Sequence, residues 1–314
     1  MSVHVKTDCY RFSVFGGDLR QVYLAKTLAL QGHTVTVYGL CAPVEAVHGR
    51  MTTKAETFAE AAEASDIFLC PTPFFKGEQV FCQNPDVRMN REVFFGEDCA
   101  GKLLFASCIP ADVRERLHRN GTFSFDLMLE ETVAVRNSIA TAEGAIAEAL
   151  IHSPYNLSGS RCLILGYGRC GAALASLLKG ISRKITVCAR SPLARAKASV
   201  CADEVMDFRN LYRALKRSEI IFNTIPCEIL NRHMVKHISP DALIVDLASA
   251  PGGVDCAAAE ECGIRTVFCP GLPGKYSPAS SAEILADAVL KILSERDCPA
   301  YAGGHSAPAG APAD

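Results

Sequence analysis

The chain has 314 residues, which suggests about two domains, and its 49% hydrophobic and 21% charged residues are enough for folded cores. Its formal charge of −2 excludes a strong overall basic field, so nucleic acid is not expected as a partner. The N-terminal sequence lacks the basic end and apolar core of a signal peptide, and no window holds the roughly 18 consecutive apolar residues that span a bilayer, so we expect a soluble, cytoplasmic protein.

The first elements predict a parallel sheet. Arg11–Phe15 reads as a strand, Gly16-Gly17-Asp18 as a tight turn, the following residues up to Leu30 as a helix, and Thr34–Tyr38 as a second strand. This order is typical of a doubly wound α/β domain. Because the turn has two adjacent glycines instead of a G-x-G-x-x-G motif, we predict no second dinucleotide site here.

Polar residues near the carboxyl ends of the first strands are candidate substrate ligands, because ligands of open α/β sheets bind beyond those ends. Arg20, near the start of the first helix, is either a salt-bridged surface residue or a cation that faces the interdomain cleft and holds an anion. Predicted strands over 67–70 and 103–107 place Thr72 and Ser107 at such ends. Residues 84–97 read as an irregular loop or lid without an assigned function.

A long helix is predicted next, over 132–152, and we expect it to connect two domains. It carries three polar side chains that are candidate substrate ligands, Asn137, Ser138 and Thr141. Glu143 follows them and is either the proton acceptor of a reaction or a carboxylate that stabilises the dipole of a helix that it begins.

The segment from 161 to 191 says most about function. The apolar run Cys162–Leu165 leads directly into a G-x-G-x-x-G motif, then into a helical pattern and a second β-branched run over 185–188. This strand, turn, helix and strand context is what a dinucleotide-binding motif requires. The free N–H groups of the new helix would face the phosphates. The motif residues predicted to bind the cofactor are Gly166, Tyr167, Gly168, Arg169, Cys170 and Gly171.

The end of the second strand bears on the choice between NAD and NADP. An NAD-binding protein usually has Asp or Glu there for the ribose hydroxyls, but this chain has Ala189-Arg190-Ser191. A guanidinium can pair bidentately with a 2′-phosphate, and Arg195 lies one helical turn further on. We therefore predict NADP, with NAD as the alternative, and we include Arg190, Ser191 and Arg195 in the cofactor site. The other interpretation is that Arg190 is a solvated loop cation.

Three further strands are predicted, over 220–225, 242–247 and 266–269, after a short helix over 205–215. Their carboxyl ends should lie at the same edge as the glycine turn and line the nicotinamide and the substrate. Thr224, Pro226 and Ala248 are assigned to the cofactor and Ser249 to the substrate. A last amphipathic helix over 279–293 is followed by an Ala-, Pro- and Gly-rich tail that is predicted to be disordered.

No metal site is predicted. The 15 cysteines include no C-x-x-C pair, and most lie in apolar runs, where free cysteine packs as a small hydrophobe in a reduced protein. His233 and His237 are four residues apart without the adjacent Glu of a zinc motif, so a solvated helix face is favoured. The loop over 270–276 has no histidine and offers Lys275 and Tyr276 as alternative proton acceptors; Lys275 is retained as a catalytic candidate.

The predicted fold class is α/β, with two doubly wound parallel-sheet domains joined by long helices, of which the second is a Rossmann NAD(P)-binding domain. The first domain covers 1–136, the linking helix 137–153 and the Rossmann domain 154–278. The helix over 279–296 is expected to pack back onto the first domain, and 299–314 is the tail.

An ordered set of motifs resembles one known family. Gly16-Gly17-Asp18 with Arg20-Gln21, then NSIATAEGAIAEAL, LGYGRCG, NTIP, DLASAPGG and PGLPGKYSP are similar to the A-subunit of dipicolinate synthase over about residues 11–293. The resemblance implies NAD(P)-dependent oxidation of a dihydrodipicolinate to pyridine-2,6-dicarboxylate in the mother cell of a sporulating bacterium. It also implies a partner, the B-subunit of dipicolinate synthase, and two α/β domains like those of hydroxyacid dehydrogenases.

Two alternatives to this function stay open. One is a D-2-hydroxyacid or amino-acid dehydrogenase, which the missing loop histidine disfavours. The other is a regulatory dinucleotide-binding protein without catalysis, which the lack of an obvious acid or base favours. A homo-oligomer is expected, as is common among such enzymes.

Overall fold

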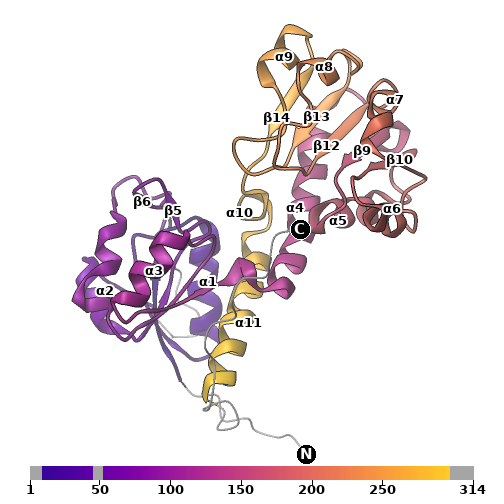
Figure 1. The fold of residues 1–314 in the computed structure, drawn as a ribbon. Helices are drawn as coiled ribbons and strands as arrows, with labels where there is room; N and C mark the ends of the chain where they lie inside the picture. The colour runs from indigo at the N-terminus through magenta and orange to yellow at the C-terminus, as the bar shows by residue number, and fades with distance from the viewer. Residues whose placement is uncertain (1–8, 45–51, 298–314) are drawn as a thin grey trace, which may run out of the picture. The chain divides into compact units, whose positions relative to one another are not determined.

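The computed structural model describes residues 9–44 and 52–297 of the chain (Figure 1). The chain divides into two compact units, of which the first is 1–133 with 282–314 and the second is 134–281. The chain passes from one unit to the other within two helices, α4 (Glu131–His152) and α11 (Pro278–Asp297). The tail predicted over 299–314 lies outside the described residues.

The first unit is built on a six-stranded sheet in the order β3-β2-β1-β4-β7-β8, in which every neighbouring pair is parallel. Its strands are β1 (Arg11–Phe15), β2 (Thr34–Tyr38), β3 (Thr53–Lys54), β4 (Ile67–Leu69), β7 (Leu103–Ala106) and β8 (Phe123–Asp126). Its other helices are α1 (Leu19–Leu30), α2 (Phe58–Ala64) and α3 (Ala111–Arg119), with short 3-10 turns η1 (Arg91–Phe95), η2 (Glu97–Cys99) and η3 (Leu127–Leu129). A small antiparallel pair, β5 (Phe75–Lys76) with β6 (Gln79–Val80), follows β4.

Both faces of this sheet are covered by hydrophobic cores, because successive residues of a strand point to opposite faces. Phe12 and Val14 of β1 pack in one buried cluster with side chains of α1 and α11. Phe15 and Phe68 pack on the other face, in a cluster that includes residues of α2 and α3. This double burial explains why the strands read as continuous apolar runs in the sequence.

The second unit repeats the same strand order, as β11-β10-β9-β12-β13-β14, and is again parallel throughout. Its strands are β9 (Arg161–Leu165), β10 (Lys184–Cys188), β11 (Glu204–Met206), β12 (Ile220–Asn223), β13 (Leu243–Asp246) and β14 (Arg265–Phe268). Its helices besides α4 are α5 (Arg169–Leu178), α6 (Pro192–Ala198), α7 (Leu211–Leu215), α8 (Arg232–Val235), α9 (Cys256–Glu261) and α10 (Leu272–Tyr276), with 3-10 turns η4 (Leu157–Gly159) and η5 (Phe208–Asn210).

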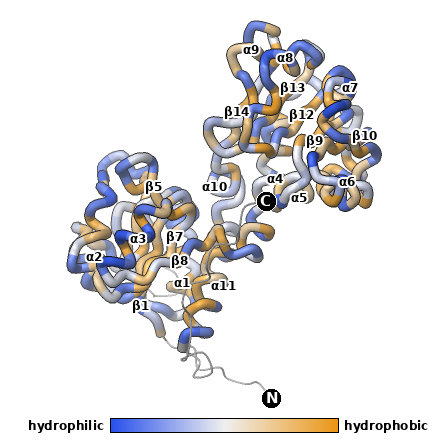
Figure 2. The backbone as a smooth tube through the Cα atoms, viewed as in Figure 1, coloured by the Kyte–Doolittle hydropathy of each residue, from blue (hydrophilic) through white to orange (hydrophobic). Residues whose placement is uncertain are grey.

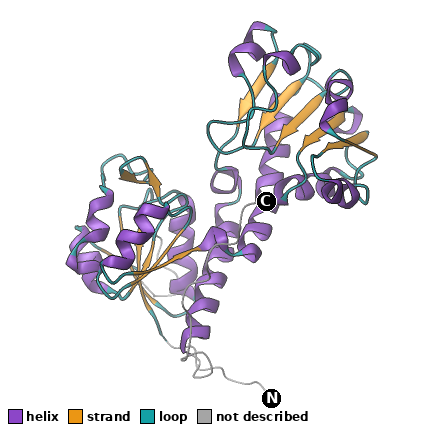
Figure 3. Ribbon diagram, in the orientation of Figure 1, coloured by secondary structure: helices purple, strands orange, loops and turns teal. Residues whose placement is uncertain are grey.

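The second sheet is also a buried central layer. Ile164 and Phe222 pack on one face and Leu163 and Ile221 on the other. Burying a side chain of this size contributes roughly 1.5–3 kcal/mol, so four buried central strands account for much of the unit's stability. Figure 3 shows helices on both sides of each sheet, and in Figure 2 hydrophobic stretches follow the strands and α11. The prediction of two doubly wound parallel-sheet domains is confirmed.

Several local predictions were wrong. The segment predicted as a helix over 205–215 begins as the edge strand β11, and only 211–215 is α-helical. The segment over 272–276, expected to be a loop, is the short helix α10. The helix predicted over 132–152 runs over Glu131–His152, but Glu143 lies in its middle and does not begin a helix, as one interpretation had it. His237 lies beyond the end of α8, not with His233 on one helix.

The described residues form neither a membrane-spanning helix nor a cluster of metal ligands. No helix in the described part of the chain is long and apolar enough to cross a membrane. Over 9–44 and 52–297, no group of three or more His, Cys, Asp or Glu side chains is arranged to hold a metal ion.

Candidate active site

The glycine turn of the second unit has a geometry that only glycine allows at two positions. Gly166 follows β9 with φ of +91°, and a Cβ there would lie 2.6 Å from Thr224 Oγ1. A Cβ on Gly171, in the first turn of α5, would lie 2.4 Å from the carbonyl oxygen of Gly166. These glycines let helix and strand approach closely.

Gly168 has a different role in the same turn. It is exposed, and a Cβ built on it would meet no atom within 4 Å. It is also the N-cap of α5 and supplies no side-chain cap. The first N–H groups of a ten-residue helix therefore face open space, which is the arrangement that binds phosphate through hydrogen bonds and the helix dipole. A dinucleotide pyrophosphate fits this turn.

The end of β10 holds the predicted ribose-recognition residues. Arg190 is exposed, and its side chain has no hydrogen-bond or ion-pair partner in the described part of the chain. Ser191 caps α6, since its Oγ accepts a bond from Ala194 N. Arg195 Nη1 donates to the carbonyl oxygens of Ala189 at 2.9 Å and Arg190 at 2.6 Å. Arg195 thus fixes the backbone that presents Arg190.

The loops after β12 and β13 are joined by hydrogen bonds to one buried carboxylate. Asp246 is 2% exposed and accepts bonds from Asn223 Nδ2 at 2.8 Å and from the backbone N–H groups of Ala248 and Gly253 at 3.1 and 2.9 Å. A Cβ on Gly253 would lie 2.2 Å from Asn223 Nδ2. The sequence motifs NTIP and DLASAPGG are therefore two halves of one hydrogen-bonded unit.

This unit positions three residues assigned to the cofactor, Thr224, Pro226 and Ala248, and one assigned to the substrate, Ser249. Thr224 donates from Oγ1 to the carbonyl oxygen of Leu165 at 2.8 Å, which ties the loop after β12 to the strand before the glycine turn. Pro226 and Ser249 are exposed, whereas Ala248 is buried. Of these side chains, the hydroxyl of Ser249 is the polar group that solvent or a ligand can reach.

In the first unit, Arg20 is buried and its charge is paired. Its side chain is 7% exposed, and Nε and Nη2 bond the carboxylate of Asp18 at 2.9 and 2.7 Å. Nη2 also donates to the carbonyl oxygen of Thr72 at 2.5 Å. Thr72 Oγ1 in turn donates to Ser107 Oγ at 2.9 Å. The structure thus brings Arg20, Thr72 and Ser107 together where β1, β4 and β7 end, and Arg20 is not the exposed residue that one interpretation expected.

The N-terminus of α1 differs from that of α5 because protein groups occupy it. Asp18 accepts a bond from Arg20 N as the N-cap of α1. Gly17 N donates to Phe81 O at 2.7 Å, and Gln83 N donates to Gly17 O at 2.9 Å, so the segment after β6 covers the turn. At the N-terminus of α1, the Asp18 carboxylate and the segment after β6 thus occupy the space that is open at the N-terminus of α5.

The polar residues of α4 make mostly local bonds. Ser138 Oγ donates to Val135 O at 2.7 Å, and Thr141 Oγ1 donates to Asn137 O at 3.1 Å, as hydroxyls often do inside helices. Asn137 Oδ1 accepts a bond from Ser281 Oγ at 3.0 Å. All of these residues belong to the second unit.

The two predicted proton acceptors differ in surroundings. Lys275 Nζ bonds the buried Glu148 carboxylate at 2.5 Å, and this hydrogen bond raises the pKa of Lys275 above its usual value. A raised pKa disfavours an amine as a base. Glu143 is exposed, and its carboxylate makes no hydrogen bond within 9–44 and 52–297.

Sequence reasoning missed the carboxylates that organise these sites. Glu148, Asp126 and Asp246 are nearly buried, with side chains accepting bonds from residues far along the chain. Asp126 accepts from the N–H groups of Cys108 and Ile109, directly after Ser107. No local pattern marks them, although Asp246 lies in a motif singled out for other reasons.

Comparison with known proteins identifies the relatives of this chain. The profile of the family formed by the N-terminal domain of the dipicolinate synthase A-subunit matches residues 11–128. The dipicolinate synthase A-subunit of Bacillus subtilis (strain 168) is 29% identical over 290 residues, which is 91% of this chain and 96% of that protein. The N-terminal part of the chain thus matches the dipicolinate synthase A-subunit family, and the chain is similar to A-subunits of that synthase along most of its length.

Solved structures of this family have the same fold. The A-subunit of dipicolinate synthase from Bacillus subtilis aligns with a TM-score of 0.78 and 28% identity, over 91% of this chain and 96% of that one. The A-subunit from Bacillus halodurans aligns with a TM-score of 0.80 and 25% identity, over 91% of this chain and 98% of that one.

The cofactor domain belongs to a wider group. Residues 129–251 match the family "D-isomer specific 2-hydroxyacid dehydrogenase, NAD binding domain". This match covers the glycine turn, Arg190, the loop after β12 and the loop after β13 up to residue 251. The protein is an NAD(P)-dependent oxidoreductase, and the nicotinamide dinucleotide site is that of the second unit.

Proposed function

We propose that this protein oxidises a dihydrodipicolinate to dipicolinate, with NADP⁺ as the hydride acceptor. The observation that carries the proposal is the match of residues 11–128 to the N-terminal domain of the dipicolinate synthase A-subunit, because that domain distinguishes this family from other dehydrogenases with the same cofactor domain. The reaction balances as loss of one hydride and one proton from the ring, giving an aromatic pyridine and NADPH.

The nicotinamide, when bound, supplies the carbon that accepts the hydride. The residues of this chain would bind the cofactor and orient it. The open turn at Gly168 and the free N–H groups of α5 would hold the pyrophosphate, and Arg190 would pair with the 2′-phosphate. The Asp246 network would fix the loops beside the ring, where Ser249 offers a hydroxyl.

For the substrate, we propose that Arg20 recognises one carboxylate in the first unit. Its Nη1 makes no hydrogen bond in the described part of the chain, while Asp18 and Thr72 O hold the other donors and fix the plane of the guanidinium. A guanidinium pre-oriented in this way binds a carboxylate with little loss of side-chain entropy. Thr72 and Ser107 are proposed as neighbouring hydroxyl ligands.

The proton acceptor is proposed to be Glu143. Its carboxylate is exposed and unpaired within 9–44 and 52–297, whereas Lys275 is held protonated by Glu148. Asn137, Ser138 and Thr141 are proposed to contact substrate only if their present bonds, within α4 or to Ser281, are exchanged.

The proposal also includes a partner. The relatives are named as the A-subunit of a synthase, which supports a complex with the corresponding B-subunit, and the product supports a role in sporulation in the mother cell.

The direct test is an absorbance assay. Purified protein with dihydrodipicolinate and NADP⁺, with and without the B-subunit, should produce NADPH and a pyridine product in equal amounts. Glu143→Gln should lower kcat by about 100-fold, the usual size of a general-base contribution, and Lys275→Gln should change it much less. Absence of both products in both conditions would contradict the proposal.

A further inference from the structure

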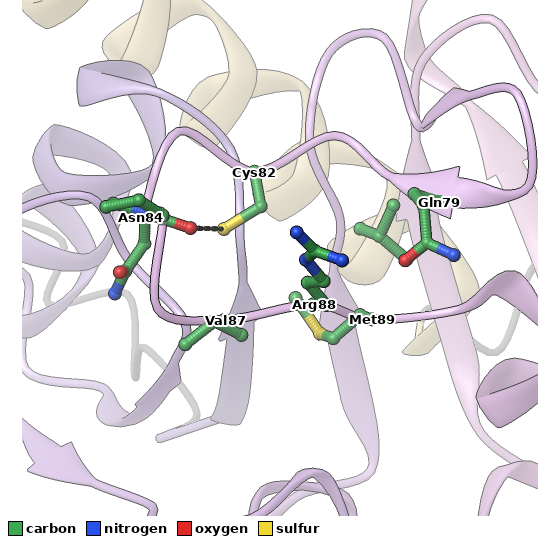
Figure 4. Close-up of a pocket in the computed structure, with 8 residues that line it drawn as sticks. Gln79, Cys82, Asn84, Val87, Arg88 and Met89 are labelled. Carbon is green, nitrogen blue, oxygen red and sulfur yellow. Dashed lines mark hydrogen bonds between the residues drawn. The ribbon is translucent and has the colours of Figure 1, made fainter.

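A pocket of about 380 Å³ lies in the first unit, and none of its lining residues is assigned to substrate or cofactor. It is formed by the segment that runs from β6 to the residues before η1 (Figure 4). The lining residues are Gln79, Val80, Cys82, Asn84, Pro85, Val87, Arg88 and Met89.

Hydrogen bonds hold the walls of this pocket to each other and to the residues after β2, so the cavity is preformed. Val80 N donates to Met89 O at 2.8 Å, which joins the two sides. Asn84 Nδ2 donates to Leu40 O at 3.0 Å, and Cys82 Sγ lies 3.0 Å from Gly39 O. Both acceptors follow β2.

The floor is packed against glycines at the carboxyl ends of β1 and β2. A Cβ on Gly39 would lie 3.0 Å from Val87 Cγ1, and one on Gly16 would lie 3.1 Å from Met89 Cε. These contacts leave no room for the floor to collapse toward the sheet. The pocket therefore keeps its apolar lining of Val80, Val87 and Met89 in place.

The pocket contains a cation whose charge is not neutralised by the described protein. Arg88 is exposed and has no ion pair or hydrogen bond within 9–44 and 52–297. Two arginines that follow in the chain are paired, Arg91 with Glu78 at 2.7 Å and Arg116 with Glu92 at 2.7 Å. Figure 4 shows the guanidinium of Arg88 in the space between Cys82 and Gln79.

Gln79 adds a second polar group. Its side-chain amide makes no hydrogen bond to the described part of the chain, whereas Asn84 uses both ends of its amide for Leu40 O and Asp86 N. The pocket thus offers one guanidinium and one amide beside an apolar floor.

We propose that this pocket binds a small carboxylate with a flat apolar body, such as an aromatic monocarboxylate. The planar fork of Arg88 matches a carboxylate bidentately, and Gln79 can donate to the same group. The thioether of Met89 and the two valines suit the flat body, since sulfur contacts aromatic rings favourably. The volume lies in the range of small-molecule sites. The site goes beyond the oxidation proposed above and uses none of its residues.

The test measures binding of benzoate to the full-length protein without cofactor, by calorimetry. Benzamide, which has the same shape without the charge, is the matched ligand. Arg119→Gln is the matched variant, because Arg119 lies on α3 and pairs with Glu115 instead of lining the pocket. Benzoate should bind saturably to wild type and to Arg119→Gln. Its affinity should fall at least about tenfold in Arg88→Gln, and benzamide should bind wild type at least about tenfold more weakly than benzoate.

Location is checked separately with isotope-labelled protein. The largest benzoate-induced amide shifts should fall within residues 79–89, and those shifts should disappear in Arg88→Gln. Three outcomes would overturn the proposal: no saturable benzoate binding, equal binding of benzoate and benzamide, or the largest shifts elsewhere with Arg88→Gln unchanged. Because no turnover is measured, these outcomes are independent of the dehydrogenase reaction.

Discussion

At the scale of single residues, the arginines of this protein differ in what neutralises them. Arg20 is buried against Asp18, so its position is fixed and only part of its hydrogen-bonding capacity is available. Arg190 is exposed and unpaired in the described part of the chain, and Arg195 holds its backbone. An exposed, unpaired arginine such as Arg190 can bind a phosphate at little cost in free energy, because no protein partner has to be displaced.

Arg190→Ala should therefore weaken NADP binding at least tenfold and change NAD binding by less than about twofold, because only the 2′-phosphate loses a charge-assisted bond. Fluorescence titration with both reduced cofactors measures this. Arg217→Ala, another exposed arginine of the second unit, removes the same charge and should leave both affinities as in wild type. Equal losses for the two cofactors would contradict a phosphate-binding role.

At the scale of elements, two glycines of the turn between β9 and α5 are present for different physical reasons. Gly171 is needed for packing, since its Cβ would overlap a backbone oxygen that cannot move aside. Gly168 is surrounded by open space and has an ordinary φ of −81°, so its hydrogen matters only to an approaching ligand. The same motif thus serves the fold at Gly171, and we predict that it serves the cofactor at Gly168.

Gly168→Ala should leave the free energy of unfolding within about 0.5 kcal/mol of wild type and weaken dinucleotide binding. Gly171→Ala should weaken binding and also lower the free energy of unfolding by about 1–3 kcal/mol, despite the higher helix propensity of alanine, because overpacking outweighs it. Urea unfolding and cofactor titration measure the two effects. A stable Gly171→Ala would show that helix and strand can move apart.

The contact of α10 with α4 predicts a pH dependence. Burial by itself would raise the pKa of Glu148, but the bonds from Lys275 Nζ and Tyr276 Oη, the latter at 2.9 Å, lower its pKa below the usual 4.5. A carboxyl with a lowered folded-state pKa contributes stability above its unfolded pKa and loses it as pH falls through the folded value.

Unfolding of wild type and Glu148→Gln should therefore be compared across pH. The stability advantage of wild type should be full above about pH 5 and should shrink progressively below about pH 4.5. Glu143→Gln, which removes an exposed carboxylate of the same helix, is the control and should show no such trend. An advantage that stays constant down to strongly acidic pH would mean that the ion pair does not stabilise the folded state.

At the scale of the whole molecule, two units with the same strand order have separate cores and different tasks. Each sheet is buried by its own pair of hydrophobic clusters, and the dinucleotide turn belongs to 134–281 alone. A ligand stabilises the unit that binds it, by an amount set by its concentration relative to Kd.

At a dinucleotide concentration of 100 times Kd, the slowest-exchanging amides of β9, β10 and β12 should gain about 2.7 kcal/mol of protection. Amides of β1 and β4 in the first unit should gain little. Hydrogen exchange followed by mass spectrometry measures both sets in one experiment. Equal gains in the two sheets would show that the units open as one cooperative block.

The fold was largely predictable because its signals are local. Both bounds of β1 and of β2 agree with the sequence prediction, since apolar runs between a glycine turn and a polar segment leave little freedom. β8 was not predicted, because its sequence, Phe123–Asp126, is short and only partly buried. α10 was not predicted, because its sequence contains proline and glycine, which usually indicate loops.

The sequence by itself determined the two α/β domains, the glycine turn and the absence of a carboxylate after β10, because each depends on neighbouring residues. Only the tertiary structure decided that Arg20 is buried with Asp18 and Thr72, and that Lys275 pairs with a glutamate 127 positions away. It also decided that Arg88 is left unpaired in a pocket, within the residues described. The physical reason is that the charge and reach of a side chain are set by whatever the folded chain brings beside it, and distant partners leave no pattern in the sequence.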